Sequence, residues 1–219
     1  MEIQKLMSFD VLYKKFDEYR TYVLTALVII GGLIGAGIYL YFSNIKYEES
    51  AQQALSEMLI EYNRAYESPE LWSDVEIGAR TGYRQYGRSS LAPYFLVLQA
   101  DASLYQHKDN EALVLMNTAI QKMPGQSPLY YLYNIKFARM QLAHEKTKDE
   151  GLSLLESLAK NIKNPQQDQA KYYLAKYYDE HEQLQKAQEL WQELVKSKSE
   201  QKDVISPWIL LAERQINQG

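Results

Sequence analysis

The sequence predicts an all-α protein, in which one membrane-spanning helix precedes an α-solenoid of stacked helix hairpins and a C-terminal capping helix. Two observations lead to this fold class. A single uncharged apolar stretch lies near the N-terminus, and the apolar residues of the remaining chain recur at the spacing of amphipathic helices. The 46% hydrophobic content of the 219 residues is thus divided between a membrane segment and helix stripes.

The composition excludes several classes of protein. The net charge is −4 and neither sign occurs in blocks, so there is no basic surface for nucleic acid, and we expect none to bind. The absence of cysteine excludes disulfides, thiol catalysis and thiolate metal ligands. A charged content of 24% with only 10 Gly and 6 Pro indicates a folded chain. One count is unusual, namely 19 Tyr against 5 Phe.

The apolar stretch runs from Tyr22 to Phe42 and contains 21 residues without a charge. At a rise of about 1.5 Å per residue it spans the hydrocarbon layer of a bilayer, which is roughly 30 Å thick. A buried core helix is seldom so uniformly apolar, and a cleaved signal peptide would have a shorter apolar run followed by a cleavage site of small residues. We therefore expect a permanent anchor in contact with lipid.

The charges on either side of the span predict its orientation. The 21-residue tail before it carries Lys5, Lys14, Lys15 and Arg20, whereas the 20 residues after it contain Lys46 as their only basic residue. Because cytoplasmic flanks are enriched in Lys and Arg, we expect the N-terminus in the cytoplasm and the rest of the chain on the far side of the membrane.

Within the span, Gly31 and Gly35 form a G-x-x-x-G pattern. Small residues at this spacing allow two membrane helices to approach closely, so the pair predicts a helix contact within the membrane. A glycine-rich phosphate-binding loop is excluded, because such a loop needs a strand before it, a helix after it and an aqueous setting.

Beyond the span, three windows share one apolar pattern that begins with a small residue. The small residues are Ala112, Gly151 and Ala187, which lie 39 and 36 residues apart, and apolar side chains follow each of them at offsets 3, 4, 7 and 8. A second small residue lies 12 or 13 positions earlier, before a polar turn, at Ala100, Ala138 and Ala175. We interpret each window as a helix hairpin whose helices cross at small residues, with a longer turn in the middle one. Such hairpins bury their apolar faces only by stacking.

Further helices are expected on both sides of the hairpins. An apolar stripe continues from the span to Tyr66, and a second helix is predicted to begin at Pro69. Near the C-terminus, Ser206 is a suitable N-cap and Pro207 suits the first position of a capping helix. The predicted segments are a tail at 1–21, the span at 22–42, a helix pair at 43–90, three repeats at 91–203 and the cap at 204–219.

The titratable residues predict neither an active site nor a metal site. His107, His144 and His181 recur every 37 residues, but equivalent positions of stacked repeats lie a helix-packing distance apart, which is too far for shared ligation. Nucleophile-elbow, P-loop and zincin motifs are absent. We therefore expect no enzymatic activity, no cofactor and no metal.

The hairpins resemble the tetratricopeptide repeat. The matching positions in 168–201 are Leu174, Ala175, Tyr178, Ala187, Trp191 and Leu194, and those in 93–126 are Ala100, Ala112, Ala119 and Pro124. The chain departs from the family pattern in the first-helix Trp position, which holds Leu96 or Lys171, and in the turn at His181-Glu182, which lacks the usual glycine.

The resemblance also implies a binding surface, because the first helices of tetratricopeptide hairpins line the concave face. The implied residues are Tyr94, Val97, Asp101, Leu104 and Tyr105 in the first repeat, Leu132, Ile135, Arg139 and Leu142 in the second, and Tyr172, Lys176, Asp179 and Glu180 in the third. The alternative for the tyrosines is that their rings pack against neighbouring helices. The register of the second repeat is open by one residue.

The order of a short tail, one N-terminal span and far-side repeats is similar to that of the YfgM family of bacterial inner-membrane proteins. The residues are most similar at 86–123 and 170–195. This resemblance implies a periplasmic repeat domain that acts as an ancillary subunit of the Sec translocon, together with a PpiD-like chaperone, on secretory polypeptides. The alternative is a structural adaptor that binds one fixed partner in another envelope or secretion complex.

Overall fold

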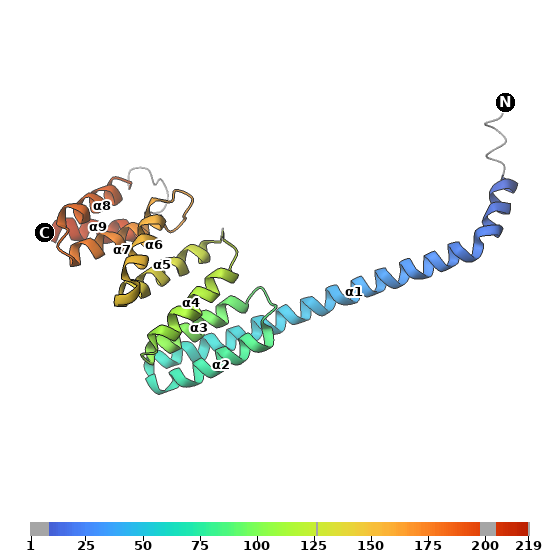
Figure 1. Ribbon diagram of the computed structural model, residues 1–219, viewed down its shortest axis with the longest axis horizontal. Coiled ribbons are helices and arrows are strands. Elements are labelled where there is room, and N and C mark those ends of the chain that lie inside the picture. The colour runs from blue at the N-terminus through green and yellow to red at the C-terminus, as the bar shows by residue number, and fades with distance from the viewer. Residues whose placement is uncertain (1–8, 126, 198–204, 219) are drawn as a thin grey trace, which may run out of the picture. The chain divides into compact units, whose positions relative to one another are not determined.

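The computed structural model describes residues 9–125, 127–197 and 205–218, and all regular elements within them are helices (Figure 1). The predicted all-α class is confirmed. The chain divides into two compact units, 1–50 and 51–219. The α-helices are α1 (Phe9–Glu67), α2 (Trp72–Tyr86), α3 (Ala92–Tyr105), α4 (Asp109–Lys122), α5 (Pro128–Leu142), α6 (Lys148–Lys160), α7 (Gln167–Glu180), α8 (Leu184–Lys196) and α9 (Pro207–Gln218), and short 3-10 turns occupy Pro69–Leu71 and Glu145–Thr147.

The part of α1 in the first unit contains the apolar stretch predicted as an anchor. Every side chain from Leu24 to Phe42 is exposed, including all the large aliphatic ones. A helix that exposes apolar side chains all round is typical of a segment surrounded by lipid. This part of α1 is accordingly the candidate membrane span among the described residues.

In the second unit, the end of α1 packs against α2 and α3 around Trp72. Trp72 is buried with Ala65, Val75 and Ala102, and its indole stacks on the ring of Tyr105 with 4.1 Å between ring centroids. Large aromatic surfaces contribute much of the burial in small cores. This packing joins the helix pair predicted before the repeats to the first hairpin.

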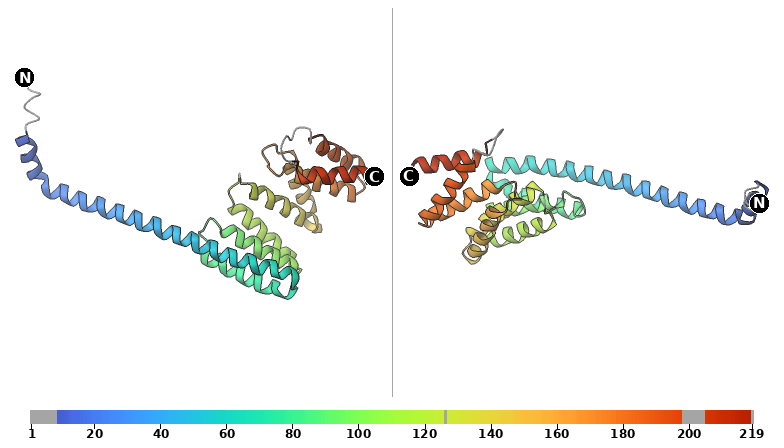
Figure 2. Two further views of the ribbon diagram at one scale, coloured as in Figure 1. Left: turned by 180° about the vertical axis from the view of Figure 1, so that it is seen from behind. Right: turned by 90° about the horizontal axis from the view of Figure 1, so that it is seen from above.

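Three hairpins follow, formed by α3 with α4, α5 with α6, and α7 with α8, and each helix from α2 to α9 packs against the next one along the chain (Figure 2). The six small residues predicted at the crossings are all buried. The helices approach closely at Gly151 of α6, where an added Cβ atom would lie 2.7 Å from the carbonyl oxygen of Ala138 in α5. The prediction that the paired helices cross at small residues is confirmed there.

The turns of the first and third hairpins end their first helices in the same way, although neither contains glycine. His107 and Glu182 adopt left-handed φ angles of 61° and 58°. The N–H of Lys108 donates to the Ser103 carbonyl at 2.9 Å, and the N–H of Gln183 donates to the Tyr178 carbonyl at 2.8 Å. These bonds form a Schellman cap, in which a residue other than glycine costs roughly 1 kcal/mol.

The middle hairpin uses a different turn. Between α5 and α6 the chain forms the 3-10 turn Glu145–Thr147, and the hydroxyl of Thr147 donates to the Gln141 carbonyl at 3.1 Å. No residue in this turn has a positive φ angle. The longer middle turn predicted from the spacing of Ala138 and Gly151 is therefore confirmed.

The second unit contains two main apolar clusters, and α5 contributes to both. Met140 packs with the α3–α4 hairpin, whereas Ile135 and Ala138 pack with α6, α7 and α8. At the C-terminal end Ile209 and Ala212 of α9 are fully buried. Ala212 packs in the cluster that Ile135 and Ala138 form with α6, α7 and α8, which we call the second cluster. The final helix thus covers the apolar face that the last hairpin would otherwise expose, as predicted for a cap.

Replacing Gly151 by alanine tests the close crossing of α5 and α6. The added methyl group would press on backbone atoms of α5, so we expect Gly151→Ala to lower the free energy of unfolding by about 2 kcal/mol. Chemical denaturation of the full-length protein in detergent, followed by circular dichroism, measures this change.

The matched control is Gly125→Ala, because an added Cβ at Gly125 would meet no described atom within 4 Å beyond its own and the adjacent residues. We expect this substitution to change the free energy of unfolding by less than about 0.5 kcal/mol. Equal effects at the two glycines would contradict the crossing argument.

Candidate functional site

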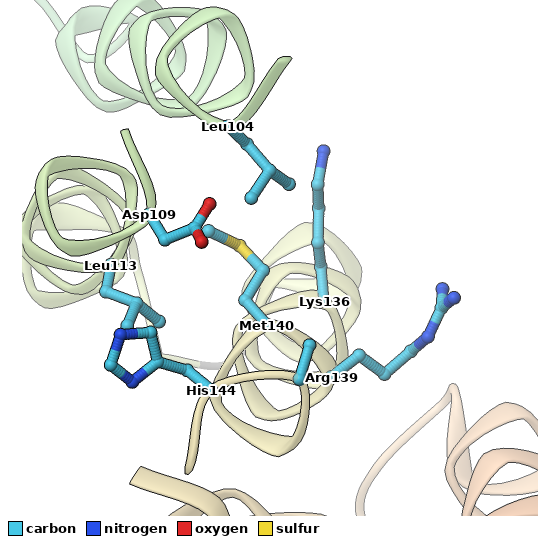
Figure 3. Close-up of a pocket in the computed structure, with 8 residues that line it drawn as sticks. Leu104, Asp109, Leu113, Lys136, Arg139, Met140 and His144 are labelled. Carbon is cyan, nitrogen blue, oxygen red and sulfur yellow. The ribbon is translucent and has the colours of Figure 1, made fainter. Parts of the chain in front are cut away.

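Two adjoining hollows lie along the first helices of the repeats, and we call them together the Arg139 groove. Both are lined by Arg139 of α5 and by Ala143, the residue that follows this helix. The first hollow has a volume of about 340 Å³ and is further lined by Leu104, Asp109, Leu113, Lys136, Met140 and His144 (Figure 3). The second has a volume of about 250 Å³ and is further lined by Leu142, Tyr173, Lys176, Tyr177, Glu180 and His181.

Some residues predicted for the concave face lie in this groove. Leu104 comes from the end of α3, Arg139 and Leu142 from the end of α5, and Lys176 and Glu180 from α7. The structure therefore brings together one or two predicted residues from each of the three repeats.

For Val97 and Ile135 the prediction of an exposed binding surface is wrong. They are only 3% and 1% exposed and pack in the two apolar clusters. Asp101 is also withdrawn from the surface, at 3% exposed. For Val97 and Asp101 the reason is that α3 is buried on nearly every side from Phe95 to Ser103. Neighbouring helices therefore cover the face that was predicted to bind a partner.

The predicted tyrosines pack against other rings and line neither hollow. Tyr94 lies 6.3 Å from Tyr133 between ring centroids, and Tyr105 stacks on Trp72. Tyr172 lies 5.1 Å from Trp191 and 5.3 Å from Trp208, which joins α7 to the capping helix. The remaining predicted residues lie elsewhere: Leu132 is half-buried outside the groove, and Asp179 lines a separate hollow beside α8 and α9.

Sequence reasoning missed Lys136 and Met140 of α5 and Tyr173 and Tyr177 of α7. Lys136 precedes Arg139 by three positions and Tyr177 precedes Glu180 by three, so helical spacing from two predicted residues that line the groove would have pointed to Lys136 and Tyr177. At Gly31 and Gly35, the glycines predicted to contact a second membrane helix, an added Cβ would meet no described atom within 4 Å beyond the adjacent residues and nearby backbone of α1, so the proposed contact stays a prediction.

A buried carboxylate lies beneath the first hollow. Asp101 of α3 accepts a hydrogen bond from the Tyr62 hydroxyl of α1 at 2.9 Å and one from the Lys136 ammonium of α5 at 2.6 Å. Burial, reinforced by the negative charge of Asp101, raises the pKa of Tyr62 well above its ordinary value and that of Tyr133 to about 12. Both phenols thus stay neutral over the physiological range, and Asp101 joins three helices.

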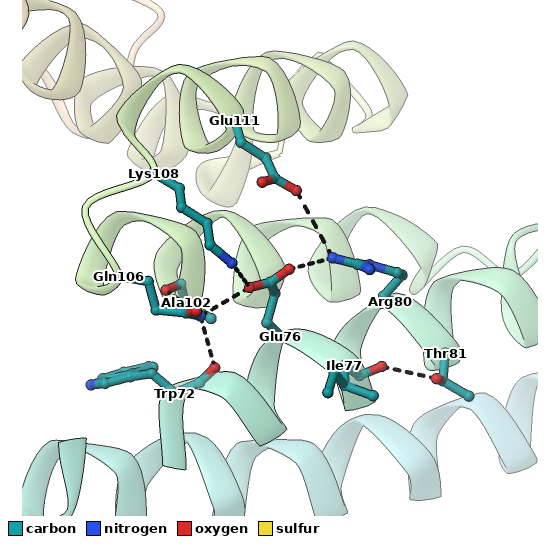
Figure 4. A network of polar contacts seen from close by, with 9 residues as sticks. All are labelled: Trp72, Glu76, Ile77, Arg80, Thr81, Ala102, Gln106, Lys108 and Glu111. Atoms are coloured by element: carbon teal, nitrogen blue, oxygen red, sulfur yellow. Dashed lines mark hydrogen bonds and ion pairs between the residues drawn. The ribbon is translucent and has the colours of Figure 1, made fainter. Parts of the chain in front are cut away.

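A second buried carboxylate fixes the turn between α3 and α4 (Figure 4). Glu76 of α2 accepts hydrogen bonds from Lys108 at 2.7 Å, from the Gln106 amide at 2.9 Å and from Arg80. Burial by itself would raise the pKa of Glu76, but the hydrogen bonds from Lys108 and Gln106 and the charges of Lys108 and Arg80 outweigh it, so the pKa is lowered. Glu76 therefore holds in place the end of α3 and the start of α4, which contribute Leu104 and Asp109 to the first hollow.

Comparison with known proteins bears on the fold. No family model matches the chain, and no curated protein matches its sequence. The similar solved structures are a crystal structure of the nearly identical TPR-like repeats of a putative kinesin light chain from Podosopora anserina and a crystal structure of a singly substituted form of the same repeats. Each is 17% identical and covers 75% of this chain and 85% of its own, with a TM-score of 0.55.

The repeat array is tetratricopeptide-like. The predicted fold class is confirmed by this likeness, which concerns the fold alone. A stacked repeat array of this kind exposes an extended surface along its helices.

The ion pairs of Glu76 predict a pH-dependent contribution to stability. Because its folded-state pKa is lowered, the contribution is present above the ordinary glutamate value of 4.5 and is lost as the pH falls through the folded-state value. We expect Glu76→Gln to lower the free energy of unfolding by about 2 kcal/mol at pH 7, and we expect this difference from the wild type to shrink below pH 4.5.

Denaturation of both proteins across this pH range measures the difference. The control is Glu61→Gln, since Glu61 pairs with Arg64 at an exposed position, where we expect less than about 0.5 kcal/mol at any pH. A cost of Glu76→Gln that stays constant with pH would contradict the assignment.

Proposed function

We propose that this protein is a membrane-anchored interaction scaffold that binds other polypeptides in the Arg139 groove. The observation that carries the proposal is the groove itself, which is lined from three successive repeats and mixes apolar, aromatic and charged side chains. An open groove of this composition suits an extended segment of chain better than a small molecule, for which enclosed apolar pockets are usual.

The membrane anchor gives the proposal its cellular setting. The apolar part of α1 supports insertion into a bilayer, and the excess of basic residues before it supports a cytoplasmic N-terminus and a periplasmic repeat domain. The resemblance to the YfgM family further supports an ancillary role at the Sec translocon of the bacterial inner membrane, beside a PpiD-like chaperone. Confinement near the translocon raises the effective concentration of emerging chains, so weak and rapidly reversible contacts suffice.

Site-specific photocrosslinking in cells tests the partner. With a photoreactive phenylalanine analogue at Lys176, which lines the second hollow, we expect capture of translocon subunits, a PpiD-like chaperone or secretory chains. The control places the same analogue at Ile162, which is 89% exposed between α6 and α7 and lines neither hollow, and we expect much weaker capture there.

The captured species separate the alternatives. A range of secretory chains supports the translocon role, whereas a single partner at fixed stoichiometry supports an adaptor of another envelope complex. Capture of cytosolic proteins alone would contradict both.

Reporter fusions at the C-terminus test the orientation. We expect alkaline phosphatase, which needs an oxidising compartment to fold, to be active when fused there, and a fluorescent protein that matures only in the cytoplasm to stay dark. The reverse pattern would place the repeats in the cytoplasm and contradict the periplasmic setting.

A further inference from the structure

The cationic side chains of the Arg139 groove differ in whether they already have a partner. The lysine and arginine side chains that line the groove, among the described residues, are Lys136, Arg139 and Lys176. Lys136 is hydrogen-bonded to the buried Asp101, and the Lys176 ammonium lies 3.6 Å from the Glu180 carboxylate. Arg139 forms no ion pair with any described residue, although it is the one cation that lines both hollows.

Arg139 is also held in an orientation suited to binding. Its guanidinium carbon lies 4.0 Å from the centre of the Tyr173 ring, in a cation–π contact between α5 and α7. A cation–π contact uses no N–H···O hydrogen bond to a carboxylate, so N–H groups of the guanidinium stay available, and the edge of a guanidinium matches the two oxygens of a carboxylate. The contact therefore positions Arg139 for an acidic side chain without neutralising its charge.

The first hollow supplies a neighbouring apolar subsite. Leu104, Leu113 and Met140 surround it, and the carboxylate of Asp109 extends toward Met140 (Figure 3). An apolar side chain would lose its contact with water there and gain favourable burial. A second acidic side chain would be repelled by Asp109, so the acidic and apolar positions of a ligand are distinct.

We propose that the Arg139 groove selects extended polypeptide segments in which an acidic side chain lies close to an apolar one. The acidic side chain pairs with Arg139, and the apolar side chain enters the hollow between Leu104, Leu113 and Met140. This selectivity rests on the proposed function and adds the chemistry of the bound chain. A nucleic acid is disfavoured as occupant, because binding a phosphate backbone takes many cations, and this acidic chain offers one unpaired cation among the described groove residues.

Charge reversal provides the test. The full-length protein in neutral phosphatidylcholine nanodiscs is titrated into three short fluorescein-labelled peptides, which share one leucine in a Gly-Ser background and carry Asp, Asn or Lys two positions after it. By fluorescence anisotropy we expect the wild type to bind the Asp peptide about fivefold more tightly than the Asn peptide. We expect Arg139→Gln to abolish this preference and Arg139→Glu to transfer it to the Lys peptide.

The matched control is Arg84→Gln, which removes an exposed arginine of α2 that lines neither hollow, and we expect the wild-type preference to persist. Equal binding of all three peptides by the wild type, or an unchanged preference in Arg139→Glu, would overturn the selectivity while leaving the scaffold function intact. If no peptide binds, the selectivity is overturned; if photocrosslinking from Lys176 also captures no envelope or secretory protein, the scaffold function fails as well.

Discussion

The close approach of the two helices in each hairpin is the constraint on which the rest of the structure depends. In the middle hairpin Gly151 meets the backbone of α5 at Ala138, and alanines occupy the equivalent positions in the other hairpins. Close packing there sets the spacing of the first helices, and those helices line the Arg139 groove. The Arg139 groove thus depends on small residues that do not line it.

Hydrogen bonds from tyrosine hydroxyls to carboxylates add to the apolar packing, and they give two of the 19 tyrosines a role that phenylalanine could not fill. Tyr62 buries its ring beside Trp72 and donates to Asp101, while Tyr178 buries its ring in the second cluster and donates to Glu156 at 2.6 Å. Burial and the Glu156 hydrogen bond raise the pKa of Tyr178 to about 12, which keeps it a donor. Phenylalanine could fill the same space, but it would leave these carboxylates without a hydroxyl partner.

The helices were predictable because each carries a local signal: an uncharged run for the span, small residues at the crossings and Pro207 at the start of α9. The groove was harder to predict than the helices. Which face of α5 is exposed depends on how this helix packs against the two apolar clusters. A shift of the helical register by one residue is enough to replace Lys136, which lines the groove, by Ile135, which was predicted to line it and is buried. On α3 no stripe marks a free face, since polar residues such as Gln99 and Ser103 are buried as deeply as its apolar ones.

The sharing of α5 between two clusters has a consequence for how the array responds to stress. A single continuous core would lose its structure in one cooperative step, whereas clusters joined through one helix can open separately. The hairpin at the C-terminal end, with its cap, can therefore open and reclose while Asp101 and Glu76 keep the first hairpin attached to the end of α1. We therefore expect the array to unfold as two cooperative units with α5 as their common boundary.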